Sequence, residues 1–177
     1  MNSPSPRAGK LNARELCVLS LMGALIFAAK LALASIPNVS LNALLIILTA
    51  VFFGWRALYS VGVYIMLEGL VFGFGMWWWS YWYLWPLLTV LAVLLRRCRS
   101  ALIWAVFAGI FGLCFGALCS IPYLFIGGWE LAFSYWISGL PFDLAHCAGN
   151  FVSTLILFKP LYAVMDKLLN KAPGGAL

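Results

Sequence analysis

The polar residues of the last apolar segment are the pattern in this chain best suited to bind a ligand or move a proton. At about 100° per residue, four of them fall within about 80° on one helix face: Asp143, His146, Asn150 and Thr154. Polar side chains on a membrane helix normally face the bundle interior or a wet cavity, where a carboxylate, an imidazole and an amide can hydrogen-bond a ligand. Hydrogen bonding between helices is the alternative interpretation of this stripe.

Metal binding and enzymatic catalysis are less well supported by the same residues. His146 is the only histidine, and a metal site needs several His, Cys or carboxylate ligands, so we expect no metal and no cofactor. The i, i+3 spacing of Asp143 and His146 permits an acid–base pair, but no plausible nucleophile and no GxSxG or HExxH motif accompanies it. The GxxxxGKS/T loop that binds ATP phosphates is also absent from the sequence. We therefore expect a protein that is not an enzyme.

Two charged residues lie inside apolar runs, Lys30 in the first run and Glu68 in the third. A charge at the centre of a bilayer costs about 2.5–3.5 kcal/mol on insertion scales, so such residues usually pair or serve a function. Lys30 can extend to the membrane interface, whereas Glu68 needs a partner, which is either Lys30 or a ligand. We assign both residues to a substrate site with Asp143, His146 and Asn150.

An aromatic cluster follows, with seven Trp or Tyr residues among the nine positions 77–85. An interfacial aromatic belt explains most of such a cluster. One helix end cannot direct all seven rings at lipid headgroups, so some turn inward, where they can stack on a planar heterocycle or cover a cation. Trp78 and Tyr81 are the members that we assign to the substrate site.

The composition defines the elements that must position these residues. Hydrophobic residues make up 65% of the 177 residues and charged residues only 9%, and the mean hydropathy is +1.02. Soluble domains carry roughly 25% charged residues, so lipid must cover most of this chain. We predict an all-α, six-helix transmembrane bundle, with spans at residues 14–35, 41–53, 57–75, a fourth ending at 96, 100–126 and 140–160. The span at 100–126 is expected to be interrupted near Pro122.

The distribution of basic residues predicts the orientation of this bundle. With six spans, every Lys and Arg outside the apolar runs falls on one side, and the opposite loops at 36–40, 76–82 and 127–138 contain none. The positive-inside bias makes the basic side the cytoplasm, so both termini are predicted to be cytoplasmic. Residues 14–170 form the predicted membrane domain, between a disordered cytoplasmic tail at 1–13 and a cytoplasmic tail at 171–177.

The first predicted helix has a stripe of small residues that includes Ala24 and Ala28, on a different face from Lys30. Such a stripe allows a second helix to approach closely, either within the bundle or from a partner. The segment from Ala24 to Ala28 reads as an AxxxA motif, the run at 36–45 follows it, and Asp143, His146 and Asn150 lead to a Lys-Pro-Leu at 159–161. Together these features resemble the substrate-binding S component of energy-coupling factor (ECF) transporters.

This resemblance implies a bacterial cell-membrane protein that captures a vitamin or related micronutrient from outside. It implies that Ala24 and Ala28 dock on a separate transmembrane coupling protein, and that two cytoplasmic ATPase subunits supply the energy. The predicted site residues suit a planar heterocycle, and the resemblance does not identify which one. The partners expected are therefore the lipid bilayer, the coupling protein, the two ATPases and the ligand, with no nucleic acid. The alternative is a membrane scaffold that resembles the rod-shape protein MreD, which needs no ligand.

Overall fold

A computed structural model describes residues 11–34 and 40–171 of the chain, and all its regular elements are helical. The helices are α1 (Ala13–Ala32), α2 (Asn42–Phe53), the short 3-10 helix η1 (Gly54–Arg56), α3 (Ala57–Phe72), α4 (Met76–Leu95), α5 (Ala101–Leu113) and α6 (Phe115–Lys171). The predicted loop at 36–40 lies almost entirely outside the described residues, as does most of the predicted tails at 1–13 and 171–177.

Helical stretches long and apolar enough to cross a membrane occupy most of the described chain. They are Ala13–Ala32, Asn42–Phe72, Met76–Leu95 and Ala101–Leu169. The second stretch contains α2, η1 and α3, and the fourth contains α5 and α6. The prediction of an all-α chain compatible with a membrane is therefore confirmed, whereas the six spans and the side of the termini stay predictions.

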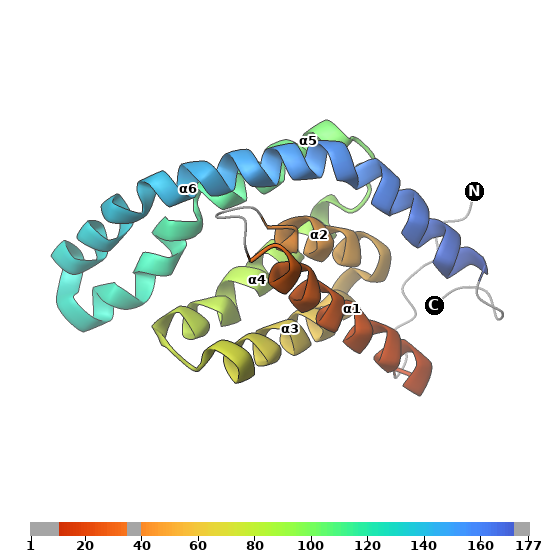
Figure 1. Cartoon of the computed structure of the whole chain (residues 1–177), viewed down its shortest axis with the longest axis horizontal. Helices are drawn as coiled ribbons and strands as arrows, with labels where there is room; N and C mark the ends of the chain where they lie inside the picture. Colours follow the sequence, from red (N-terminus) through yellow and green to blue (C-terminus); the bar gives the residue numbers. More distant parts are fainter. Residues whose placement is uncertain (1–10, 35–39, 172–177) are drawn as a thin grey trace.

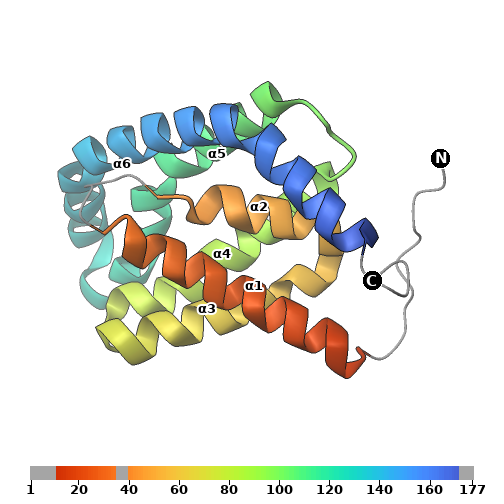
Figure 2. The ribbon, with the colours of Figure 1, turned by 45° about the vertical axis from the view of Figure 1, so that its right-hand side comes forward.

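The helices pack as two groups around a central α2 (Figures 1 and 2). Helices α5 and α6 run side by side along one flank, and α1 packs mainly on α3. Helix α2 contacts α1, α3, α4 and α6, and each of its residues from Asn42 to Ala50 is buried. An apolar helix without a polar face is expected at such a central position.

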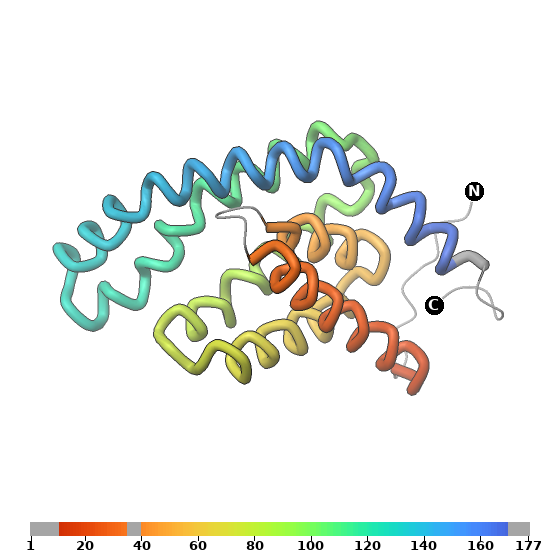
Figure 3. The backbone as a smooth tube through the Cα atoms, in the orientation of Figure 1, coloured from red at the N-terminus to blue at the C-terminus, as the bar shows by residue number. Residues whose placement is uncertain are grey.

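Glycines reverse the chain within α6. Gly127 (φ −137°, ψ 16°) and Gly128 (φ 74°, ψ −169°) have non-helical backbone angles, and the chain folds back at this point (Figure 3). The positive φ of Gly128 is accessible to glycine without the penalty that a Cβ atom brings. The chain thus turns at the glycine pair where the predicted outer segment 127–138 begins, and it is helical again from residue 129.

Two expectations about the helices are wrong. The predicted loop at 76–82 is helical, since α4 begins at Met76 directly after the turn at Gly73 (φ 89°). The predicted helix over 100–126 is broken at Cys114 and not near Pro122, which lies inside α6. Pro122 cannot donate to the Leu118 carbonyl one turn earlier, and the Tyr83 hydroxyl donates to that oxygen instead at 2.6 Å. A side chain from α4 thus allows the proline inside the helix.

Basic residues gather where helices meet at one end of the bundle. Arg56 pairs with Glu15 in the first turn of α1 at 2.5 Å, which joins the start of α1 to the α2–α3 junction. The Arg96 guanidinium, just after α4, lies against η1, and the Arg99 guanidinium lies 4.8 Å from the ring centre of Tyr162 on α6. The α2–α3 junction, the α4–α5 junction and the later part of α6 are therefore neighbours.

Candidate ligand-binding site

A cavity of about 540 Å³ lies among the helices and receives side chains from α1 to α6. This volume falls within the range of small-molecule sites. Five of the seven predicted site residues line it, and they come from four different helices: Lys30, Glu68, Tyr81, His146 and Asn150. The remaining two, Trp78 and Asp143, are not among its lining residues.

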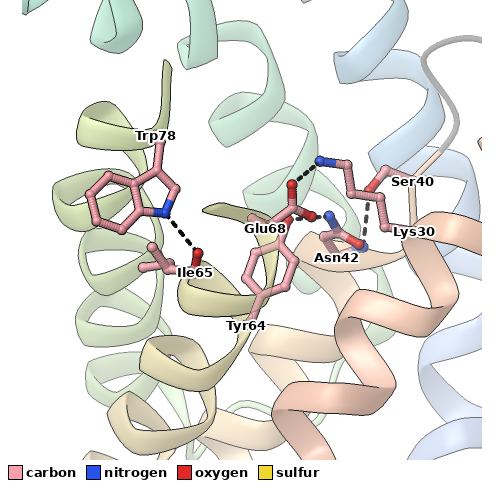
Figure 4. A network of polar contacts seen from close by, with 7 residues as sticks. All are labelled: Lys30, Ser40, Asn42, Tyr64, Ile65, Glu68 and Trp78. Carbon is pink, nitrogen blue, oxygen red and sulfur yellow. Dashed lines mark hydrogen bonds and ion pairs between the residues drawn. The ribbon is translucent and has the colours of Figure 1, made fainter. Parts of the chain in front are cut away.

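An ion pair between α1 and α3 lies at the cavity wall (Figure 4). Lys30 Nζ donates to Glu68 Oε2 at 2.5 Å, and the Glu68 side chain is fully buried while 30% of the Lys30 side chain is exposed. The sequence left open whether Glu68 pairs with Lys30 or with a ligand, and the structure shows the pair with Lys30. Lys30 lies in the last turn of α1, where a positive charge is favoured by the helix dipole.

A polar group that sequence reasoning missed adjoins this ion pair. Asn42, at the start of α2, donates from Nδ2 to the Tyr64 hydroxyl at 2.7 Å, and its backbone N–H donates to Ser40 Oγ at 3.1 Å (Figure 4). Asn42 Oδ1 is buried and has no hydrogen-bond partner among the described residues. An asparagine that opens an otherwise apolar helix was the available sequence signal.

Aromatic rings of α4 form another wall of the cavity. Trp77, Tyr81 and Trp85 occupy successive turns of one helix face, with ring centres 5.2 Å apart for the first pair and 5.4 Å for the second. All three line the cavity, and the buried Trp85 Nε1 has no partner among the described residues. The i, i+4, i+8 spacing from Trp77 could have identified the two tryptophans.

Other members of the aromatic cluster have different roles. Trp78 is buried between α3 and α4, where its Nε1 donates to the Ile65 carbonyl at 2.8 Å (Figure 4). Trp79 and Trp82 are exposed, as expected for rings at a membrane interface. Trp78 therefore contributes to helix packing, and its assignment to the substrate site stays a prediction.

Helix α6 supplies the remaining polar side chains of the cavity. The His146 ring stacks on Phe115, with centres 5.7 Å apart and planes inclined by 16°, and His146 Nδ1 lies 2.9 Å from the Phe142 carbonyl oxygen. Asn150 Nδ2 donates to the Ala108 carbonyl of α5 at 3.3 Å. The predicted polar stripe thus faces the bundle interior, and Thr154, which continues it, is fully buried.

Asp143 connects two parts of the fold. Its Oδ1 accepts the backbone N–H of Gly116 at 2.9 Å, close to the start of α6 after the break at Cys114. The first N–H groups of a helix lack intrahelical acceptors, so a carboxylate there stabilises the helix start. Asp143 and His146 thus make hydrogen-bond contacts with different backbone groups.

The small-residue stripe of α1 lies on an exposed surface. Ala24 and Ala28 are exposed, whereas Gly23 on another face of α1 is buried against α3, where an added Cβ atom would lie 2.5 Å from the Ser60 carbonyl oxygen. Close approach of α1 to its neighbour within the bundle therefore uses Gly23. The two alanines are left on the surface, and their role in docking stays a prediction.

The site combines features typical of ligand binding. A buried carboxylate, an ammonium group, two amides and an imidazole surround a space that has aromatic walls, so hydrogen bonding, charge pairing and stacking are all available to one small molecule. No family model, no curated protein and no solved structure matches the chain.

Proposed function

We propose that this protein is the substrate-binding membrane subunit of an ECF-type importer. It captures a small planar heterocycle, a vitamin or related micronutrient, from outside a bacterial cell and binds it in the cavity between α1, α2, α3, α4, α5 and α6. The observation that carries this proposal is the cavity itself. Its ionic, amide and imidazole groups meet from four helices around one space of about 540 Å³, and charged groups are costly in an apolar chain unless they serve such a purpose.

The distribution of charge supports six spans with both termini in the cytoplasm. Arg56, Arg96 and Arg99 lie at the end of the bundle where α1 begins, with Glu15 in its first turn. Lys30 follows Glu15 by 15 positions in sequence, or about 22 Å along the helix. The cavity therefore lies toward the end opposite the arginines, which the positive-inside bias assigns to the outer side.

The exposed alanine face of α1 supports the proposed partners. Ala24 and Ala28 leave a shallow strip on which a helix of a coupling protein can pack closely. The coupling protein would connect this subunit with two cytoplasmic ATPases, because the sequence lacks a phosphate-binding loop of its own. Binding of substrate and use of ATP are then divided between different chains.

Native mass spectrometry of the protein isolated from its host tests both parts of this proposal. We expect one small molecule bound in equimolar amount and, under mild extraction, a complex with a membrane partner and two ATPases. ATP-dependent uptake of the identified molecule by proteoliposomes that contain the complex would complete the test. A protein that carries no ligand and no such partners would favour the membrane scaffold.

Substitutions within the cavity give a more specific test. Glu68→Leu removes the only acidic side chain among the described residues that line the cavity, and Asn150→Leu removes an amide donor. Each substitution is expected to weaken binding of the co-purified molecule at least about tenfold, as for one lost charged or buried hydrogen bond. Leu94→Ala on the exposed face of α4 is the matched control and should leave affinity unchanged. Unchanged affinity in both cavity variants would remove these residues from the site.

A further inference from the structure

We propose that the ligand is an organic cation, which binds by displacing the Lys30 ammonium group from a site formed by the Glu68 carboxylate and three aromatic rings. This inference rests on the proposed ligand-binding function and specifies the chemical class of the ligand. Lys30 occupies the position that the cationic group of the ligand would take.

The surroundings of the Lys30 ammonium group are those of a cation site. Lys30 Nζ lies 5.1 Å from the ring centre of Phe72, 5.6 Å from that of Tyr81 and 6.0 Å from that of Trp77. The Glu68 carboxylate completes the site at 2.5 Å. Aromatic faces carry negative partial charge, and several rings around one position are the arrangement by which proteins bind alkylated ammonium ligands.

Only one partner of the ion pair is able to leave. Glu68 is fully buried about one turn before the end of α3, and its short side chain cannot carry the carboxylate to the membrane interface. Lys30 is 30% exposed, lies in the last turn of α1 and has four flexible methylene groups, so its ammonium group can move to the interface. The exchangeable component is therefore the cation.

This asymmetry selects the charge of the ligand. Displacement of Lys30 by a neutral molecule would leave the Glu68 carboxylate buried without a counter-charge, which is strongly unfavourable. An anion that binds to Lys30 would lie beside the Glu68 carboxylate and compete with it for the same ammonium group. A cationic ligand restores the charge balance of Glu68, and the three aromatic rings again have a cation beside them.

Two unpaired polar atoms define further features of the ligand. Among the described residues, Asn42 Oδ1 lacks a donor and Trp85 Nε1 lacks an acceptor, and both residues are buried and line the cavity. A ligand that carries one hydrogen-bond donor and one acceptor would satisfy both atoms. The row formed by Trp77, Tyr81 and Trp85 offers stacking surfaces to a flat ring. The ligand class is therefore a heteroaromatic cation with an amide-like or amino substituent.

Three probes of similar shape and different charge test the proposal: 1-methylnicotinamide (cation), nicotinamide (neutral) and nicotinate (anion). Binding is measured by equilibrium dialysis against the purified full-length protein in detergent micelles, at up to millimolar probe concentration. In the wild type the cation should bind most tightly. Lys30→Met removes the internal competitor, so its affinity for the cation should rise at least about tenfold, with little change for the other probes.

Matched variants separate this effect from a general change in structure. Glu68→Gln should abolish the preference for the cation, and Lys167→Met, which removes a lysine on the exposed surface of α6, should behave as wild type. If Lys30→Met does not give folded protein, Lys30→Gln takes its place, since an uncharged amide can still hydrogen-bond Glu68. Tightest binding of nicotinate together with its loss in the Lys30 variant would overturn the proposal. Failure of the Lys30 variant to bind the cation would overturn it equally.

The failure of this inference is distinguishable from the failure of the proposed function. If a neutral or anionic molecule co-purifies with the wild type and is transported, the importer function stands and the cation site is refuted. If the probes show the expected charge preference but no ATPase partner and no uptake are found, the cation site stands and the importer function is refuted.

Discussion

Gly112 on α5 allows α6 to carry its polar side chains into the cavity, and its replacement by alanine tests this packing. An added Cβ atom at Gly112 would lie 2.8 Å from the backbone carbonyl of His146 and 2.8 Å from Asn150 Nδ2. The amide can rotate away, but the His146 carbonyl belongs to the helix backbone. Gly112→Ala must therefore push α6 away from α5 by several tenths of an ångström.

Two other glycines give a graded series. At Gly109, one turn earlier on α5, the nearest atoms to an added Cβ are the Cys147 carbonyl oxygen and Phe151 Cβ, both at 3.4 Å, which is close to ordinary contact. At Gly62 on α3 no atom lies within 4 Å. Alanine in a helix interior is favoured over glycine by about 0.5–1 kcal/mol, and overpacking costs about 1–3 kcal/mol. We expect Gly62→Ala to stabilise the protein, Gly109→Ala to be near neutral and Gly112→Ala to destabilise it by about 1–2 kcal/mol.

Thermal unfolding of the purified variants in one detergent, followed by tryptophan fluorescence, measures this order. Binding of the co-purified ligand to the same samples gives a second readout, because Gly112→Ala also shifts His146 and Asn150 at the cavity wall. Gly62→Ala should bind as wild type. A Gly112→Ala variant that is as stable as Gly62→Ala and binds normally would refute the proposed packing of α6 on α5.

Two other substitution experiments test parts of the structure away from the cavity. Ala24→Trp and Ala28→Trp should prevent co-purification of the coupling protein while ligand binding is kept, since the bulky ring fills the exposed strip of α1. Leu94→Trp on the exposed face of α4 is the control. Assembly that survives both alanine substitutions would exclude this docking face. Tyr83→Phe should destabilise the protein by about 1–2 kcal/mol, because the carbonyl left free by the proline loses its only described donor. Combination with Pro122→Ala should reduce that cost in a thermal unfolding assay, and equal costs in both backgrounds would contradict the assigned role of Tyr83.

The apolar character of the chain made its main features predictable. In a chain with so few charges, each ion or amide inside an apolar run is costly, so Lys30, Glu68, His146 and Asn150 were identified from sequence, and all four line the cavity. The helical period correctly placed the polar stripe of α6 toward the bundle interior, because one buried face follows directly from residue spacing.

The remaining features depend on contacts between distant segments, which a local pattern does not contain. Pro122 was expected to interrupt a helix, but the donor that compensates for it is Tyr83 on α4, 39 positions away in sequence. The aromatic cluster gave no means of telling its members apart, and it is the rotation of α4 that brings Trp77 and Tyr81 to the cavity wall and Trp78 against α3. The rotation of a helix about its axis depends on its neighbours, and a helix that is apolar on all sides does not reveal it.

Unpaired polar atoms at the cavity wall favour a ligand site over a purely structural role for the same residues. Some buried hydroxyls elsewhere in the bundle are satisfied locally, as where the Thr49 and Thr89 hydroxyls each donate to a carbonyl one turn earlier. Of the seven buried side-chain atoms that lack a partner in the described part of the chain, three belong to residues that line the cavity: Asn42 Oδ1, Glu68 Oε1 and Trp85 Nε1. A scaffold gains nothing from such atoms and would be more stable if they were apolar. These three residues border one space, as expected if a ligand supplies the missing partners.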